Sequence, residues 1–558
     1  MIAPLLATAH ASSASQGIPV PPIRWLAIMP PVIMIGGAVL LLAVASLVRR
    51  PLRVTLSTVA TVAISGAALG VAIWQWADVQ EHGPHTYIKQ AVVMDGFSIL
   101  VTMLVAIAML LSALVADGYL RREGVQGAEF HVLAMVSASG AMLMGIANDL
   151  IIVFLGLEIL SIALYVLTAF NYRRAASGEA ALKYFILGGF SSAIFIYGVA
   201  LTYGATGSTN LTQIADFLSK NVVLSNGLLL AGLALMLAGF AFKVAAVPFH
   251  MWTPDVYQGA PSPVTGFMSA VAKAGAFAAM LRVLFSSFGV VSTDWRPIVY
   301  GLAVLSLVLG AFVALRQRDV KRMLAYSSIN HAGFVLLGLQ AATTRGVSSA
   351  LYYLFVYMFM VIGSFAVVTV IGGRGDTDHD LSRYRGLARR QPVLAFAFAV
   401  LLLAQAGVPF TTGFLAKFQV VIASVDAHSV PLAVVAMVSA ALAAFFYLRV
   451  TILMYGPAEE PEPAPVPAFA PAPAPVTVGA RDDADTLRDH LNAALLLETD
   501  GPEPSPEAVA AEPGPERVAV PVPALIAIGV CIAVTVVFGI IPAPLVDFAH
   551  KATLLFLP

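Results

Sequence analysis

Runs of about 20 apolar residues recur along almost the whole chain, separated by short polar segments. Coiled as a helix, one such run crosses a bilayer core of about 30 Å. Hydrophobic residues make up 59% of the chain and charged residues only 11%, which excludes a soluble globular protein. Because lipid offers no partners for backbone N–H and C=O groups, these runs must satisfy them internally, as helices do. We therefore expect an all-α polytopic membrane protein.

The apolar runs predict about fourteen transmembrane helices. They cover residues 26–48, 54–76, 96–116, 130–147, 150–170, 181–204, 226–250, 262–284, 297–315, 323–343, 347–372, 391–423, 431–455 and 522–546. The expected organisation is an N-terminal tail (1–25), helices 1–3 (26–129), a first repeat (130–284), a second repeat (297–455), a linker (457–519) and a last helix (522–546).

Basic residues gather in the odd-numbered loops, although the chain carries 31 basic and 31 acidic residues and no net charge. The positive-inside rule assigns such loops to the cytoplasm, so both termini are expected on the outer side of a bacterial plasma membrane. The balanced charge gives no indication of a nucleic-acid partner. The basic residues concerned are Arg49, Arg50, Arg53, Arg121, Arg122, Arg173, Arg174, Arg316, Arg318, Lys321, Arg322, Arg374, Arg383, Arg385, Arg389 and Arg390.

Two segments outside the apolar runs have simple compositions. The N-terminal segment has no basic residue before Arg24, so we expect an external tail rather than a cleaved signal peptide. Residues 457–519 are rich in Pro, Ala and Glu, which predicts a disordered cytoplasmic linker. Within it, 483–497 could form a short amphipathic helix that docks a partner, or serve only as part of a tether.

Helix-breaking residues interrupt two of the expected spans. Pro248 lies inside the seventh span, where it removes one backbone donor and frees the carbonyl of Val244. Gly407, Pro409 and Gly413 interrupt the twelfth. Interrupted spans five apart are typical of two related five-helix halves with inverted topology. We therefore expect spans 4–8 and 9–13 to form two such repeats, with broken helices 7 and 12.

Lysines, rather than arginines, occupy the apolar spans. Of the eight lysines, Lys183, Lys243, Lys273 and Lys417 fall within spans, whereas almost all arginines lie in loops or at span edges. Arginine keeps its proton in proteins, but a desolvated lysine can lose it near neutral pH. The placement of lysines inside the spans and arginines outside them predicts proton exchange inside the membrane. The alternative, a lysine with no role in proton exchange, is strongest for Lys183, which lies near a span end and could simply extend its ammonium to the membrane interface.

Glu158 is the one carboxylate deep in an apolar span, and it is the expected partner of Lys243. A buried charge costs at least about 2.5 kcal/mol. An ion pair at about 4 Å, with an effective dielectric constant of about 20, contributes about 4 kcal/mol. Two histidines, His250 and His331, lie at breaks or near mid-span and titrate close to neutral pH, although His331 could equally be a satisfied core histidine. Asp255 is expected in a loop or cap.

Cofactor motifs are missing from the sequence. No P-loop, dinucleotide-binding, HExxH or CxxC pattern occurs, and the single cysteine, Cys531, excludes an intrachain disulfide and a cysteine-ligated iron–sulfur cluster. We therefore expect neither a cofactor nor a metal in this chain. The energy for any transport must come from an ion gradient or from a partner protein.

Several segments together resemble the antiporter-like membrane subunits of respiratory complex I, most closely the subunit N group, which includes mitochondrial subunit 2. They are EILSIALYVLTAF, FKVAAVPFHMWTPDVYQGAPSPVTGF, DVKRMLAYSSINHAGF and AGVPFTTGFLAKF, within residues 95 to 455. Subunit M usually carries a glutamate in place of Lys417, and subunit L has a lateral amphipathic helix that a Pro-rich linker cannot supply. The resemblance implies a proton-translocating subunit of NADH:quinone oxidoreductase.

The same resemblance implies roles for seven residues and locates the cofactors elsewhere. Glu158 and Lys243 would form a modulating pair, Lys273 would be the central proton carrier, and Lys417 would control exchange with the far side. Lys183, His250 and His331 would lie along the connecting hydrophilic axis. NADH, FMN, iron–sulfur clusters and quinone would be bound by partner subunits, and a neighbouring antiporter-like subunit and small membrane subunits would flank this chain in the bilayer.

Two other functions fit the same scaffold. An Mrp-type sodium or potassium/proton antiporter subunit would use it without redox chemistry. A non-pumping scaffold subunit would only complete the membrane arm, and charge-neutralising changes at Lys243 and Lys273 would then affect assembly but not turnover.

Overall fold

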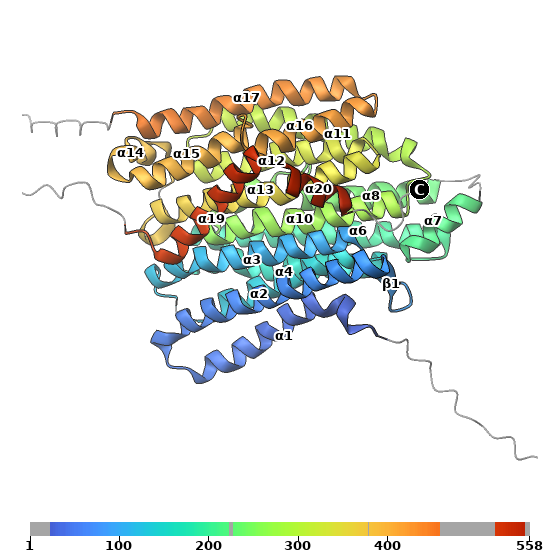
Figure 1. Cartoon of the computed structure of the whole chain (residues 1–558), viewed down its shortest axis with the longest axis horizontal. Helices are drawn as coiled ribbons and strands as arrows, with labels where there is room; N and C mark the ends of the chain where they lie inside the picture. The colour runs from blue at the N-terminus through green and yellow to red at the C-terminus, as the bar shows by residue number, and fades with distance from the viewer. Residues whose placement is uncertain (1–22, 126, 222–226, 378, 458–518, 553–558) are drawn as a thin grey trace, which may run out of the picture.

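The computed structural model describes residues 23–125, 127–221, 227–377, 379–457 and 519–552. The helices lie side by side with their axes roughly aligned, as a membrane-spanning bundle requires (Figure 1). Nearly all of the expected N-terminal tail and the linker, with its segment 483–497, lie outside the described residues.

The helices of the first half are α1 (Trp25–Leu47), α2 (Arg50–His82), α3 (Gly96–Arg122), α4 (Glu129–Ile146), α5 (Leu150–Thr168), α6 (Ala175–Thr206), α7 (Leu211–Lys220), α8 (Gly227–Lys243), α9 (Trp252–Gly259) and α10 (Ser262–Ser286). The rest are α11 (Ser292–Leu315), α12 (Val320–Gln340), α13 (Thr344–Ile371), the 3-10 turns η1 (Arg374–Asp376) and η2 (Leu381–Tyr384), α14 (Leu387–Arg390), α15 (Pro392–Ala406), α16 (Thr412–Asp426), α17 (Val430–Tyr455), α19 (Val522–Ile540) and α20 (Ala543–Lys551).

Eleven of the described helices are long and apolar enough to cross a membrane, and α8 and α15 are shorter apolar helices. These two end at the interruptions that the sequence predicts. Helix α8 stops at Lys243, earlier than expected from the position of Pro248, because the backbone leaves the helical region at Ala245, which has a positive φ of 60°. Helix α15 stops at Ala406, where Gly407 takes a left-handed φ of 90°.

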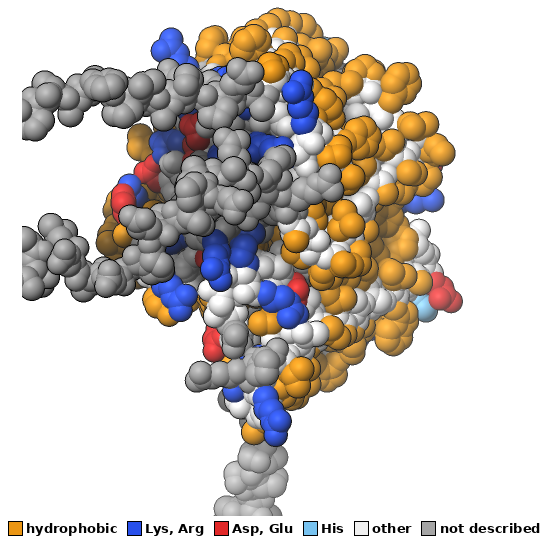
Figure 2. Space-filling view, turned by 90° about the vertical axis from the view of Figure 1, so that its left-hand side faces the viewer, with side chains coloured by type: hydrophobic (Ala, Val, Ile, Leu, Met, Phe, Trp, Pro, Cys, Tyr) orange, Lys and Arg blue, Asp and Glu red, His pale blue; other side chains and the backbone are white. Residues whose placement is uncertain are grey.

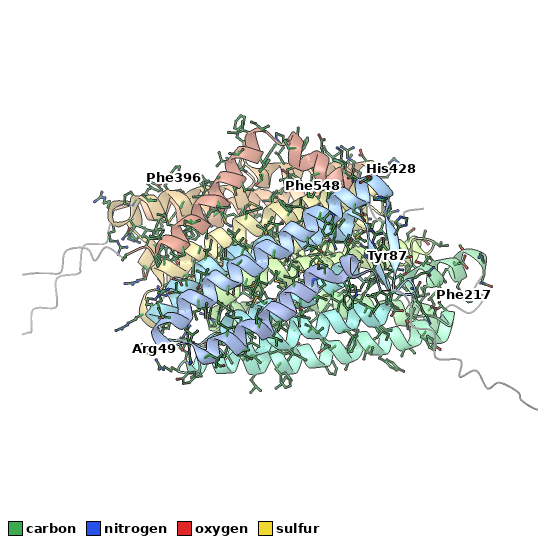
Figure 3. All side chains as sticks on the ribbon, turned by 60° about the horizontal axis from the view of Figure 1, so that its bottom comes forward. Arg49, Tyr87, Phe217, Phe396, His428 and Phe548 are labelled. Atoms are coloured by element: carbon green, nitrogen blue, oxygen red, sulfur yellow. The ribbon has the colours of Figure 1, made fainter. Side chains whose placement is uncertain are left out.

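One element departs from the all-α expectation. Strands β1 (His85–Tyr87) and β2 (Val92–Met94) pair antiparallel in the connection between α2 and α3. The side-chain amides of Asn148 and Asn210 both donate hydrogen bonds of 2.8 Å to the carbonyl of Gln90 in the hairpin. This connection is polar and lies at the bundle end opposite Arg49 (Figure 3), so a short hairpin can form there without leaving backbone groups in lipid.

Helices α10 and α13 form the centre of the bundle. Both are buried along their whole apolar windows, and they pack against each other and against α3. By contrast, α1, α6, α17 and α19 expose large apolar side chains, as expected of helices that face lipid. Figure 2 shows such side chains over the flank, whereas Lys and Arg gather at the end that carries the α1–α2 turn. The polar axis of the molecule must therefore run near α10 and α13.

The basic loops meet at one end of the bundle. Arg122, after α3, donates to the carbonyl of Thr369 near the end of α13, at 3.0 Å from each terminal nitrogen. The backbone N–H of Val320 donates to the carbonyl of His379, and that of Leu381 donates to the carbonyl of Arg318, both at 2.8 Å. These contacts join loops that are far apart in sequence and agree with the shared side predicted from their charge.

A buried ion pair fixes the opposite end of α10. Arg282 is 1% exposed and holds the Asp95 carboxylate with two hydrogen bonds of 2.9 Å, while it also donates to the carbonyl of Gly145. The guanidinium lies 4.7 Å from the centre of the Phe97 ring. Arg282 lies near the end of an expected span and is nevertheless buried, because a bidentate carboxylate and a carbonyl replace its hydration shell.

Replacing Arg282 with methionine should destabilise the protein by about 3–5 kcal/mol, because the Asp95 charge would stay buried without its guanidinium. The matched control is Arg345→Met, which breaks the half-exposed Arg345–Asp426 pair and should cost at most about 1 kcal/mol. Thermal unfolding of the purified variants in detergent measures both effects. Equal losses from the two substitutions would contradict the structural role given to Arg282.

Candidate functional site

Three of the predicted site residues are lysines buried between helices. Lys243, Lys273 and Lys417 are only 5%, 4% and 6% exposed. Lys243 is the last residue of α8, Lys273 lies in α10, and Lys417 lies in α16 just after the second break. Each ammonium therefore depends on protein atoms, rather than on water at the surface, for its solvation.

Lys243 is solvated mainly by hydroxyl groups. Its Nζ donates to Ser161 Oγ at 2.6 Å and to Tyr184 Oη at 3.4 Å. It also lies 5.7 Å and 5.3 Å from the ring centres of Tyr165 and Tyr184, within the range of a cation–π contact. Because Lys243 ends its helix, the negative end of the α8 dipole also favours its charge.

Glu158 lies one helical turn before Ser161 on α5. Among the described residues, no ion pair joins the Glu158 carboxylate to Lys243, whose Nζ is bound by Ser161 and Tyr184. The Oε1 atom of Glu158 is buried and has no hydrogen-bond partner within the described part of the chain. The direct ion pair expected between Glu158 and Lys243 is therefore not present in this structure, and Ser161 binds the ammonium in place of the carboxylate.

Lys273 and Lys417 are each held by a backbone carbonyl. Lys273 Nζ donates to the carbonyl and the Oγ of Ser328, and it lies 5.4 Å from the ring centre of Tyr357. Lys417 Nζ donates to the carbonyl of Ala406 at 2.8 Å. Ala406 is the last residue of α15, so its carbonyl has lost its partner within the helix and is free to accept this bond. The second break thus supplies the acceptor for Lys417.

The two histidines have different environments. His331 is buried on α12, with Nδ1 2.6 Å from Tyr353 Oη and Nε2 3.1 Å from Tyr447 Oη. His250 is half-buried in the connection between α8 and α9, and its Nδ1 is buried with no hydrogen-bond partner in the part of the chain that the structure describes. The roles predicted for both histidines stay predictions, and the two tyrosines around His331 carry no sequence pattern that would have indicated them.

Lys183 does not belong to the buried set. Its side chain is 45% exposed and forms ion pairs with Glu179 at 2.7 Å and Asp255 at 3.2 Å. Asp255 lies in the first turn of α9 and also binds Arg322 at 2.9 Å. The two basic side chains, Arg322 and Lys183, thus compensate the charge of the Asp255 carboxylate. These charged groups line an open cavity of about 400 Å³.

A second cluster of buried charges, around Lys321 and Asp376, was not predicted from the sequence. Lys321, predicted in a basic loop, begins α12 instead and is completely buried; it donates to the carbonyl of Ala260 at 2.6 Å and lies 3.6 Å from Asp376. Asp376 also accepts from the N–H and Oγ of Ser262 and from His379. Burial would raise the pKa of Asp376, but Lys321 and His379 hold it well below its usual range. No sequence pattern joins these distant residues.

Groups of three or more His, Cys, Asp or Glu that could hold a metal are absent from the described residues. The three buried lysines lie among hydroxyl groups and backbone carbonyls, and His331 lies between two tyrosine hydroxyls. Such groups can accept, hold and pass protons.

A known family profile covers the part of the chain that holds these groups. A profile described as "NADH:quinone oxidoreductase/Mrp antiporter, TM" matches residues 147–443, which contain all seven predicted site residues. The chain belongs to this family.

Individual relatives match over most of their length. A protein of Trichlorobacter lovleyi named NADH-quinone oxidoreductase subunit N is 41% identical over 78% of this chain and 88% of its own. A protein of Acidothermus cellulolyticus with the same name is 37% identical over 97% of this chain and 98% of its own. In the solved structure of respiratory complex I from Thermus thermophilus with bound aureothin, one chain is 29% identical, with a TM-score of 0.71 over 94% of this chain and all of that one.

Gly407 allows us to test how closely Lys417 must be positioned. A Cβ added at Gly407 would lie 3.0 Å from Lys417 Cδ, and φ is +90° there. We expect Gly407→Ala to displace the lysine and slow proton transport by up to about 10²-fold. Gly83→Ala is the control, because Gly83 also has a positive φ but has open space around it. The measurement is proton uptake by vesicles containing the assembled complex; equal rates in the two variants would contradict this positioning.

Proposed function

We propose that the chain is the proton-translocating, antiporter-like membrane subunit of a bacterial NADH:quinone oxidoreductase, corresponding to subunit N. The observation that carries this proposal is the set of three buried lysines, each held by neutral oxygen atoms, in a chain of this family. An amine held by neutral oxygens can lose its proton without leaving an unpaired counter-charge behind. The subunit is part of an enzyme complex but carries no redox centre of its own.

We count about fourteen membrane crossings: the eleven long apolar helices, α12, and two broken crossings, α8 with α9 and α15 with α16. The first proposed repeat then runs from α4 to α10, and the second from α11 to α17. Each contains one break with a lysine beside it, Lys243 in the first and Lys417 in the second. With the basic loops in the cytoplasm, both termini lie on the outer side of the plasma membrane.

Proton transfer would begin at Lys243. Electron transfer in partner subunits shifts the position of Glu158, and a closer carboxylate favours the charged amine, whereas a more distant one favours release of its proton. Lys243 then passes a proton to Lys273, and Lys273 passes it through the His331 region to Lys417. His250 would connect the first break to this axis, and Lys183 would act at its cytoplasmic edge, among the charged groups of the open cavity.

The partners follow from this assignment. NADH, FMN, iron–sulfur clusters and quinone bind to other subunits, and neighbouring membrane subunits cover the flanks of this chain. The family profile also includes Mrp antiporters, but the two sequence relatives described above, 41% and 37% identical to this chain, are named as subunit N, which favours the redox-coupled complex.

Replacing Lys243 with alanine in the intact complex should slow proton transfer through this subunit by about 10²-fold or more, because a positioned proton carrier is lost. The number of protons pumped per electron, measured in proteoliposomes, should therefore fall. Lys220→Ala is the matched control, since Lys220 is exposed and pairs only with Asp216 in the described part of the chain. An unchanged ratio in fully assembled Lys243→Ala complex would favour the scaffold role instead.

A further inference from the structure

His331 belongs to a continuous chain of hydrogen bonds that crosses four helices. Tyr447 Oη, on α17, lies next to Ser327 Oγ, on α12, as well as 3.1 Å from His331 Nε2. Ser327 Oγ lies 3.5 Å from Gln405 Oε1, on α15. The amide nitrogen of Gln405 then reaches Ser364 Oγ, on α13, at 2.8 Å. The direction of each bond decides where the proton of His331 lies.

The orientation of the Gln405 amide is fixed by its surroundings. Gln405 Nε2 lies 3.4 Å from the carbonyl of Leu401, which can only accept a hydrogen bond, so this atom must be the NH₂ group. Ser364 donates its own hydroxyl proton to the carbonyl of Met360 at 2.8 Å and is therefore free to accept from the amide. Gln405 Oε1 consequently points toward Ser327 and must accept.

The remaining bonds follow one after another. Ser327 donates to Gln405, so its oxygen accepts the proton of Tyr447 Oη. The Tyr447 oxygen in turn accepts from His331, which requires a proton on Nε2. The Nδ1 atom then carries a lone pair and accepts from Tyr353 Oη at 2.6 Å.

The opposite direction would leave two buried groups unsatisfied. If Ser327 donated to Tyr447, Gln405 Oε1 would have no donor among the described residues. Tyr353 Oη would then accept from His331, and its own proton would have no acceptor in the described part of the chain. Unsatisfied buried polar groups are costly, so the first direction prevails.

We propose that Gln405 is a positioning residue that holds neutral His331 in the Nε2–H tautomer through Ser327 and Tyr447. An amide oxygen accepts a hydrogen bond but is a very weak base. The series of hydrogen bonds from Gln405 therefore orients His331 without removing its proton. Gln405 directly precedes Ala406, whose carbonyl binds Lys417. The same turn of α15 therefore positions the imidazole and the lysine. The importance of this tautomer for transport rests on the proposed function, but the tautomer itself does not.

Solid-state NMR of the assembled complex, labelled with [¹³C,¹⁵N]histidine, tests the assignment. The His331 signals are identified by their loss in His331→Gln. We expect a proton on Nε2 only in the unmodified protein, and both tautomers at comparable intensity in Gln405→Leu. Gln405→Glu should restore the single tautomer, because a carboxyl group in either protonation state still presents an acceptor to Ser327.

Ser327→Ala breaks the same chain without changing Gln405, and it too should give both tautomers. Ser439→Ala is the control. Ser439 lies on α17, and its buried hydroxyl group bonds to Asn330 and to the carbonyl of Leu307, neither of which belongs to the hydrogen-bond series from Gln405 to His331. A single Nε2–H tautomer that persists in Gln405→Leu or in Ser327→Ala would overturn the proposal. The spectra are recorded on resting complex, so they decide the tautomer even if the subunit pumps no protons.

Discussion

A lysine ammonium that is enclosed in a membrane protein loses its hydration, and protein dipoles must replace it. Here the replacements are hydroxyls, backbone carbonyls and aromatic faces around Lys243, Lys273 and Lys417. Lys273 is bound by Ser328 within α12, whereas two helix breaks act at Lys243 and Lys417. One places Lys243 at the C-terminus of α8, and the other frees the carbonyl of Ala406. The fold is therefore organised around interrupted helices that solvate a charge without fixing it in an ion pair.

The ion pairs at the two ends of the bundle show the contrast. Arg282 with Asp95, and Lys321 with Asp376, are fully buried and carry additional hydrogen bonds, so their charges are held in place. The lysines between the two ends lack such close carboxylates among the described residues. Tight pairs at the ends stabilise the packing of α10, whereas weakly held charges along the middle stay able to exchange protons.

Much of this arrangement could be predicted from the sequence, because span length, loop charge and the residues Pro248 and Gly407 each have a direct physical meaning. The buried lysines and His331 were identified for the same reason, since charges in apolar runs are rare. The sequence could not show that Lys321 is buried or that Lys183 is exposed. The burial of Lys321 depends on Ala260 and Asp376, which are distant in sequence, and the exposure of Lys183 depends on which face of α6 points outward. The series of hydrogen bonds from Gln405 to His331 could not be predicted either, because it joins four helices through residue types that are common in protein cores.

The central claim is that protons pass between the three buried lysines, and where no hydrogen bond joins their nitrogens, water must complete the path. A cryo-electron microscopy map of the assembled complex, at a resolution that shows water, tests it most directly. The account predicts ordered water linking Lys243, Lys273 and Lys417, with His331 along the line. Dry apolar packing between the three nitrogens, with no water in any recorded state of the enzyme, would contradict it.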